Sequence, residues 1–93
     1  MYSYIKGIIT DIESSYVVIE NNGIGYMVFV SNPFSYKEGE EVTIYLYQQI
    51  REDENTLYGF KTKENKDLFL KLIGVKGLGC KMALPMLSVN NIN

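Results

Sequence analysis

The stretch Gly74-Val75-Lys76-Gly77-Leu78-Gly79-Cys80-Lys81 decides how the last third of the chain folds. Apolar residues lie on both sides of it at helical spacing, which predicts a turn between two helices. Gly77 and Gly79 allow positive φ and a close approach of the backbone to a ligand, because they have no Cβ atom. A helix that begins near Cys80 would have free amide N–H groups and a positive dipole at that end, and such an end binds phosphate.

Other interpretations of this turn fit the spacing to different degrees. A Gly-x-Gly pair after a helix is often only a C-terminal cap and a tight turn, and that alternative stays open. A dinucleotide fingerprint needs a third glycine and a preceding strand, and a Walker loop needs a longer spacing to Lys81 and a following Ser or Thr. The stretch therefore predicts a helix-hairpin-helix whose backbone amides grip one phosphate of a nucleic-acid strand without reading its bases.

The composition is that of one small globular domain, or of one domain and part of another. The chain has 93 residues, of which 46% are hydrophobic and 22% are charged. It has neither a run of about 18 apolar residues nor a basic segment followed by an apolar core at its amino terminus, so we expect no membrane helix and no signal peptide. A single cysteine, Cys80, and the lack of histidine predict no internal disulfide, no zinc site and a cytoplasmic location.

The net charge of −2 is unfavourable for a nucleic-acid binder, but the charge is unevenly distributed. Residues 38–54 carry six acidic residues and one arginine, whereas residues 61–82 carry six lysines and two acidic residues. Basic charge is therefore concentrated around the predicted hairpin. The six lysines are Lys61, Lys63, Lys66, Lys71, Lys76 and Lys81.

Ahead of the hairpin, runs of β-branched and aromatic residues separated by turn residues predict five short strands. Gly7 indicates a bulge or sharp bend in the first strand, and Asn21-Asn22-Gly23 indicates a tight hairpin turn after the second. The fourth strand has the clearest period of two. We expect the strands at about 4–12, 16–20, 24–30, 41–50 and 56–60, with the charged turn 51–55 between the last two.

The predicted fold class is mainly β plus α, with a five-stranded OB-fold β-barrel followed by a helix-hairpin-helix. An SH3-like barrel is the alternative, because strand count does not separate the two. The division of the chain is predicted at residue 61, which gives a barrel domain over 1–61 and the first helix-hairpin-helix of a truncated helical domain over 62–93.

The helices have identifiable boundaries. Thr62 is predicted to cap a first helix over about 63–73. A second helix over about 80–87 contains Pro85, which should kink or shorten it, and the tail 88–93 is expected to fray. Two such short helices are marginal by themselves, so they should pack on the barrel or need a missing partner, and we expect an amino-terminal piece of a longer protein.

Four motifs occur in order along nearly the whole chain, and together they carry a family resemblance. They are Gly7-Ile8-Ile9, then Gly23-Ile24-Gly25-Tyr26, then Arg51-Glu52-Asp53 before Leu57-Tyr58-Gly59-Phe60, and last Leu68-Phe69 leading to Gly77-Leu78-Gly79-Cys80-Lys81-Met82-Ala83-Leu84. This set resembles the RuvA family, the DNA-binding subunits of the bacterial Holliday-junction branch-migration complex.

The resemblance implies a non-enzymatic subunit that binds four-way DNA junctions by their structure and not by their sequence, in recombination and repair. It implies a homotetramer, and a hexameric motor ATPase partner that is engaged through a carboxy-terminal domain absent here. By matching position, the phosphate-gripping hairpin falls on Gly77, Leu78, Gly79 and Lys81, and an acidic pin at the crossover falls on Glu52 and Asp53. The second hairpin of the family is also absent, so branch migration by this chain alone is not expected.

Other functions fit parts of the sequence. The runner-up is an OB-fold interaction or assembly module without junction-specific DNA binding. An enzyme is the weakest option, because the chain has no histidine and no nucleophile beside a base, although Glu52 and Asp53 could in principle hold magnesium. Without the resemblance, Glu52-Asp53-Glu54 would be a solvated turn and Cys80 a packing or capping residue. We expect no cofactor and no bound metal.

Overall fold

The computed structural model of the chain describes the backbone of residues 2–90 and the side chains of residues 2–88. Its strands are β1 (Tyr4–Ile12), β2 (Tyr16–Asn21), β3 (Ile24–Phe29), β4 (Glu41–Arg51) and β5 (Glu54–Phe60). A 3₁₀ turn, η1 (Pro33–Ser35), lies between β3 and β4, and two helices follow the strands: α1 (Lys63–Gly74) and α2 (Cys80–Asn90).

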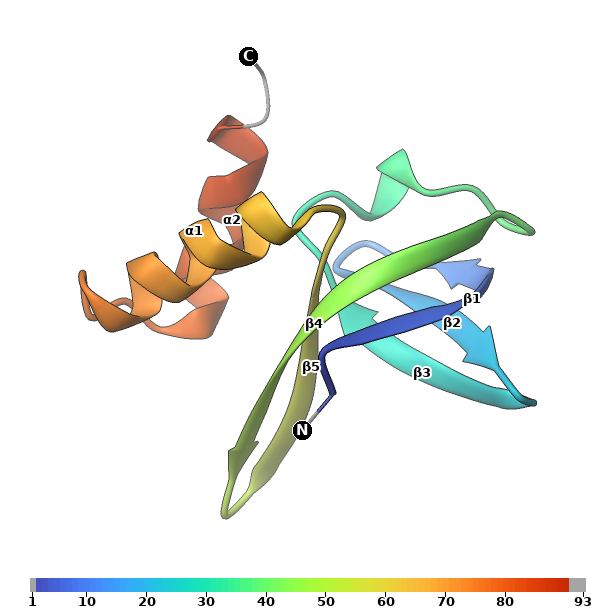
Figure 1. Cartoon of the computed structure of the whole chain (residues 1–93), viewed down its shortest axis with the longest axis horizontal. Coiled ribbons are helices and arrows are strands. Elements are labelled where there is room, and N and C mark those ends of the chain that lie inside the picture. Colours follow the sequence, from blue (N-terminus) through green and yellow to red (C-terminus); the bar gives the residue numbers. More distant parts are fainter. Residues whose placement is uncertain (1, 91–93) are drawn as a thin grey trace.

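The five strands form a closed barrel in the order β1-β2-β3-β5-β4 (Figure 1). All neighbouring pairs are antiparallel except β3 and β5, which pair in parallel over Val28–Phe29 and Leu57–Tyr58. The pairing of β1 with β4 then closes the ring. This arrangement confirms the predicted OB-type barrel followed by a helical pair.

Strand β1 closes the barrel by pairing with two neighbours in succession. Its first half pairs with β4 and its second half with β2, and the register shifts between Ile9 and Asp11. A bulge or sharp bend was predicted at Gly7. The observed bulge lies about three residues further along the strand. Gly7 has a different role, because a Cβ atom there would collide with the carbonyl of Glu20 on β2. Its glycine allows the two strands to approach each other closely.

The tight hairpin between β2 and β3 follows its prediction. Asn22 and Gly23 both have positive φ, 53° and 81°, and Asn21 pairs directly with Ile24. Two residues in that conformation form the type of turn whose twist matches that of the flanking strands.

Strand β4 has a different partner on each of its faces. Ile44 and Leu46 are buried in the barrel core, together with Ile9, Val17, Ile19, Val28, Val30 and Tyr36. Tyr45 and Tyr47 point the other way and pack in a second apolar cluster under the helices. The period of two predicted from the sequence is thus the alternation between two buried clusters.

The second cluster joins the helical pair to the barrel. Its buried members are Tyr58 and Phe60 of β5, Phe69 of α1, and Cys80, Ala83, Leu84 and Leu87 of α2. Because helices of this length are marginal alone, this contact supplies the support that the sequence required. Figure 1 shows the two helices lying together at one side of the barrel.

The predicted boundaries of α1 and the predicted start of α2 are confirmed, whereas the predicted end of α2 is wrong. The Thr62 side chain accepts a hydrogen bond from the Asn65 amide at 3.1 Å, which is the expected cap. Helix α2 continues through Pro85 to Asn90, so the proline does not shorten it. Residues 88–90 were predicted to fray and are helical, and the Ser88 hydroxyl donates to the Ser31 carbonyl at 2.7 Å. The rest of the predicted tail, 91–93, lies outside the described residues.

Within residues 2–90, no helix is long and apolar enough to cross a membrane.

Gly59 provides a test of barrel packing. Although its φ is not in the left-handed region, a Cβ atom at this position would overlap the side chains of Val28 and Ile44 in the core. We expect Gly59→Ala to lower the free energy of unfolding by about 1–3 kcal/mol in a denaturant titration. Gly74→Ala is the matched control, because a Cβ atom there meets open space at the end of α1. An equal effect of both substitutions would contradict the packing of Gly59.

Tyr36 makes the fold sensitive to alkaline pH. Burial, and then the charge of Glu40, raises the pKa of Tyr36 to about 12 from its ordinary 10.0. The folded chain therefore holds the phenolic proton more tightly than the unfolded chain does. The resulting stability is complete below pH 10 and is lost as the pH rises towards 12, by up to about 2–3 kcal/mol. In denaturation curves between pH 9 and 12, Tyr36→Phe should show a shallower loss of stability than the unsubstituted chain, and identical pH profiles would contradict this.

Candidate nucleic-acid interface

The glycine turn between α1 and α2 spans residues 75–79. The amides of Val75 and Lys76 both donate to the Lys71 carbonyl, at 2.7 and 3.3 Å, and the Leu78 amide donates to the Leu72 carbonyl at 3.2 Å. Gly77 has a φ of 71°, which allows the chain to reverse within this network. The turn is thus a well-formed end of α1, as the plain-cap alternative requires.

Beyond that cap, the same turn leaves a row of unused donors. Within the described residues, the amides of Gly77, Gly79, Cys80 and Lys81 donate no hydrogen bond. The Gly79 carbonyl accepts from Met82 and Ala83 at 3.1 and 2.9 Å, so α2 starts immediately after it. These free amides lie at the positive end of the α2 dipole, where an anion is stabilised.

The four residues predicted for the grip differ in their surroundings. Gly77 and Gly79 are exposed, whereas Leu78 is half-buried and packs against the second apolar cluster. Both glycines allow positive φ, and of the two only Gly77 adopts it. A Cβ atom at Gly79 would meet nothing within 4 Å, so no contact within the described residues requires a glycine there.

The acidic turn is shorter than the predicted charged turn 51–55. β4 and β5 pair up to Arg51 and Glu54, so the turn consists only of Glu52 and Asp53, both exposed. β1 pairs with β4 only as far as Tyr45, so the end of the β4–β5 hairpin is a two-stranded ribbon. Figure 1 shows this ribbon extending beyond the barrel with the turn at its tip.

Two polar side-chain pairs support the ribbon, one between β4 and β5 and one within β5. The side-chain amide of Gln48 donates to the Asn55 side chain at 3.0 Å, and the Thr56 hydroxyl donates to the Glu54 carboxylate at 2.8 Å. Ile50 has few contacts near the tip, since 65% of its surface is exposed. The carboxylates at the tip are therefore presented to solvent by a narrow, polar extension.

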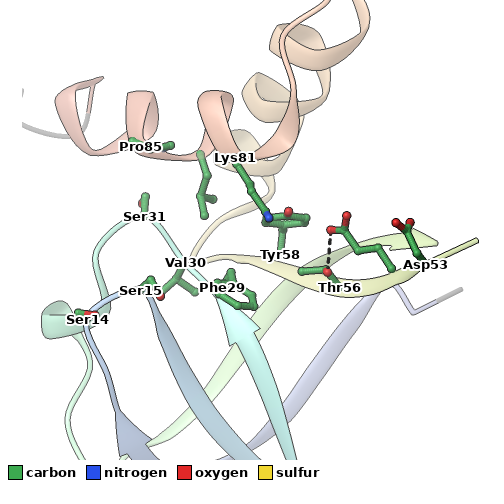
Figure 2. A pocket seen from close by; sticks show the side chains of 12 residues that line it. Ser14, Ser15, Phe29, Val30, Ser31, Asp53, Thr56, Tyr58, Lys81 and Pro85 are labelled. Atoms are coloured by element: carbon green, nitrogen blue, oxygen red, sulfur yellow. Dashed lines mark hydrogen bonds between the residues drawn. The ribbon is translucent and has the colours of Figure 1, made fainter. Parts of the chain in front are cut away.

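A cleft of about 660 Å³ lies between α2 and the open end of the barrel, and it contains residues from both predicted sites. Lys81 extends from α2 into this cleft, and Asp53 borders it from the hairpin (Figure 2). The remaining lining residues are Ser14, Ser15, Phe29, Val30, Ser31, Glu54, Thr56, Tyr58, Leu84 and Pro85. The sequence did not predict this cleft, because no local pattern places residue 81 beside residue 53.

Tyr58 is a cleft residue whose buried hydroxyl lacks a hydrogen-bond partner within the described residues. Its side chain is 2% exposed, and its hydroxyl has no hydrogen-bond partner in the described chain. Burial, followed by the neighbouring Cys80 and Glu54, raises the pKa of Tyr58 above its usual value, so the hydroxyl stays protonated and is a free donor. Tyr58, Gly59 and Phe60 are buried in succession, so no alternation marks Tyr58, and no sequence signal predicts the missing partner.

Cys80 is a packing residue. Its thiol is buried in the second apolar cluster, and burial raises its pKa above the ordinary value, so it is held as the unreactive thiol. No group of three or more Cys, Asp and Glu side chains in residues 2–90 is arranged to hold a metal ion.

Comparison with known proteins identifies the family. The family model for the RuvA N terminal domain matches residues 1–59. Three curated relatives carry the name "Holliday junction branch migration complex subunit RuvA". The protein of Streptococcus pyogenes serotype M18 is 52% identical over 93 residues, which cover 98% of this chain and 47% of the relative. The protein of Streptococcus equi subsp. zooepidemicus is 50% identical with the same coverage.

The third relative, from Acholeplasma laidlawii, is 50% identical over 93 residues, which cover 100% of this chain and 50% of the relative. The chain therefore spans about half the length of the curated relatives it matches. Because the family match and the identity extend through the barrel, and the identity continues through the helical pair, the chain belongs to the RuvA N-terminal domain family.

Proposed function

We propose that this chain binds four-way DNA junctions by their structure and independently of their sequence, and holds them open for branch migration by a partner motor. One observation carries the proposal: the fold exposes groups of opposite charge preference at two separate turns. The glycine turn has free amides beside lysines, and the acidic turn has a pair of exposed carboxylates. The names of the curated relatives, which describe subunits of a Holliday-junction branch-migration complex, support the same function.

The glycine turn is proposed as the contact with the DNA backbone. Its free amides at Gly79, Cys80 and Lys81 can donate to one phosphate, and Lys76 and Lys81 add positive charge beside them. Such contacts recognise only phosphate and sugar, so they position the DNA without reading its bases. This accounts for binding that is independent of sequence.

The acidic turn is proposed as the element that discriminates against plain duplex. Exposed charges repel over only about 8 Å at physiological salt, so carboxylates must reach the DNA closely to matter. The two-stranded ribbon gives Glu52 and Asp53 that reach. At a junction the arms diverge around the crossover, which leaves room for the carboxylates, whereas a continuous duplex would bring its phosphates against them.

The wider assembly is also part of the proposal. We place the division between the barrel and the helix-hairpin-helix at residue 61, between the end of β5 and the start of α1. We further propose that the subunit acts as a homotetramer in the cytoplasm, is not itself an enzyme, and serves a hexameric motor ATPase engaged through the part of the relatives that this chain does not match. Four copies would set four acidic turns around one crossover.

The direct test compares the affinities of the chain for a four-way junction and for linear duplex of the same arm sequences, by gel shift. We expect junction binding to be at least about tenfold tighter at 50 mM salt, and both affinities to fall as salt rises to 200 mM because phosphate contacts release counterions. Junctions with permuted arm sequences should bind equally. Equal affinity for junction and duplex would refute the proposed function.

Neutralising the acidic turn tests its role separately. We expect Glu52→Gln combined with Asp53→Asn to strengthen duplex binding and to lower the ratio of junction to duplex affinity by about fivefold or more, because the repulsion is removed. The matched control is Asp11→Asn combined with Glu38→Gln, which removes the same charge from exposed positions on the barrel. If both double variants change the ratio equally, net charge explains the effect and the acidic turn has no special role.

A further inference from the structure

We propose that Phe69 is a positioning residue that holds the glycine turn at a fixed place relative to the acidic turn. The proposal rests on the proposed function, because it explains how one subunit presents its two DNA-facing elements in a constant geometry. Phe69 touches neither element. Its role is exerted through the contact between α1 and the ribbon that carries Glu52 and Asp53.

Phe69 joins the two parts by aromatic contacts. Its side chain is fully buried, and its ring lies 5.7 Å from Tyr47 of β4 and 5.7 and 4.9 Å from Tyr58 and Phe60 of β5, measured between ring centroids. Tyr47 and Tyr58 are direct neighbours across the two strands. One side chain of α1 is therefore seated on both strands of the hairpin, close to the point where the free ribbon begins.

Other contacts also hold the helical pair to the barrel, and two of the residues involved, Leu78 and Cys80, lie at the glycine turn in the same apolar cluster as Phe69. The chain enters α1 from β5 through Thr62, and the Ser88 hydroxyl binds the Ser31 carbonyl near the opposite end of α2. The glycine turn is thus the far end of the pair, as Figure 1 shows. Phe69 lies partway between the covalent connection and that end, where a contact resists tilting of α1.

A small tilt would be sufficient to disturb binding. The 12 residues of α1 make a helix of about 18 Å, so a tilt of about 10° moves its far end by about 3 Å. Amide-to-phosphate hydrogen bonds require donor–acceptor distances of about 2.7–3.2 Å. If the acidic turn stays in place on the DNA, a displacement of the glycine turn by about 3 Å would break its hydrogen bonds to phosphate.

The test measures this geometry without DNA. Nitroxide labels are attached at Asp53→Cys and Lys76→Cys, both exposed positions, in a Cys80→Ala background, and the distance between them is measured by pulsed electron paramagnetic resonance. With Phe69 present we expect one narrow distribution. Phe69→Leu should broaden it or shift it by about 3 Å, as the helix length implies. Phe69→Met, whose flexible side chain can fill an irregular gap, replaces it if the leucine variant fails to fold.

Ile19→Val is the matched control, because Ile19 is fully buried in the barrel core and lies outside the second apolar cluster. It removes core volume and should leave the distance distribution unchanged. The proposal is overturned if the Phe69 variant keeps the distance distribution of the unsubstituted chain. It is also overturned if the control broadens the distribution as much as the Phe69 variant does.

Unlabelled proteins connect the geometry to binding. We expect Phe69→Leu to reduce the ratio of junction to duplex affinity by about fivefold or more at a temperature where circular dichroism shows it folded, with Ile19→Val unchanged. A Phe69→Leu variant that keeps the original ratio contradicts the positioning role. If the unsubstituted chain shows no junction preference, the proposed function fails, whereas the label distances still decide whether Phe69 fixes the two turns.

Discussion

The burial of β4 on both faces is the constraint on which the rest of the structure depends. Inward, Ile44 and Leu46 fill the barrel, and outward, Tyr45 and Tyr47 face the helices. The same strand then continues past the barrel to carry the acidic turn. Closure of the barrel, attachment of the helical pair and presentation of the carboxylates are therefore consequences of one strand whose two sides are occupied.

This arrangement makes the helical pair dependent on the barrel. Helices of 12 and 11 residues are marginal in water, and hydrogen bonds within them do not overcome the cost of nucleation. Aromatic contacts add about 0.5–1.5 kcal/mol each beyond simple burial, and Phe69 makes three of them. The glycine turn can keep its cap and its free amides because α1 is held by this cluster.

Local chemistry made much of the fold predictable from the sequence. The alternation in β4, the Asn22-Gly23 turn and the Thr62 cap each depend on residues close together in the chain, and each is present as predicted. The errors depend on distant partners. The bulge beyond Ile9 is determined by how β1 divides its pairing between two strands, and α2 passes Pro85 while its apolar face is buried against the second cluster.

The candidate site was predictable as residue types but not as an arrangement. Lys81 has the expected position at the start of α2, yet its side chain lies in a cleft with Asp53, and no periodicity relates two residues of separate elements. The unpartnered hydroxyl of Tyr58 is equally nonlocal, since it depends on what the folded barrel fails to place beside it. Such features are properties of packing, which a pattern of residue types does not specify.

The position of Lys81 changes which groups carry the proposed contact with phosphate. Lys81 shares a cleft with the carboxylates of Asp53 and Glu54, so negative charge lies on the same side of the fold as its ammonium group. The amides of Gly79 and Cys80 donate no hydrogen bond within the described chain, and the dipole of α2 adds to their positive end. In the proposed contact, the backbone amides would therefore supply the directional part, exposed Lys76 in the turn would add positive charge, and the glycines would let a phosphate reach that backbone.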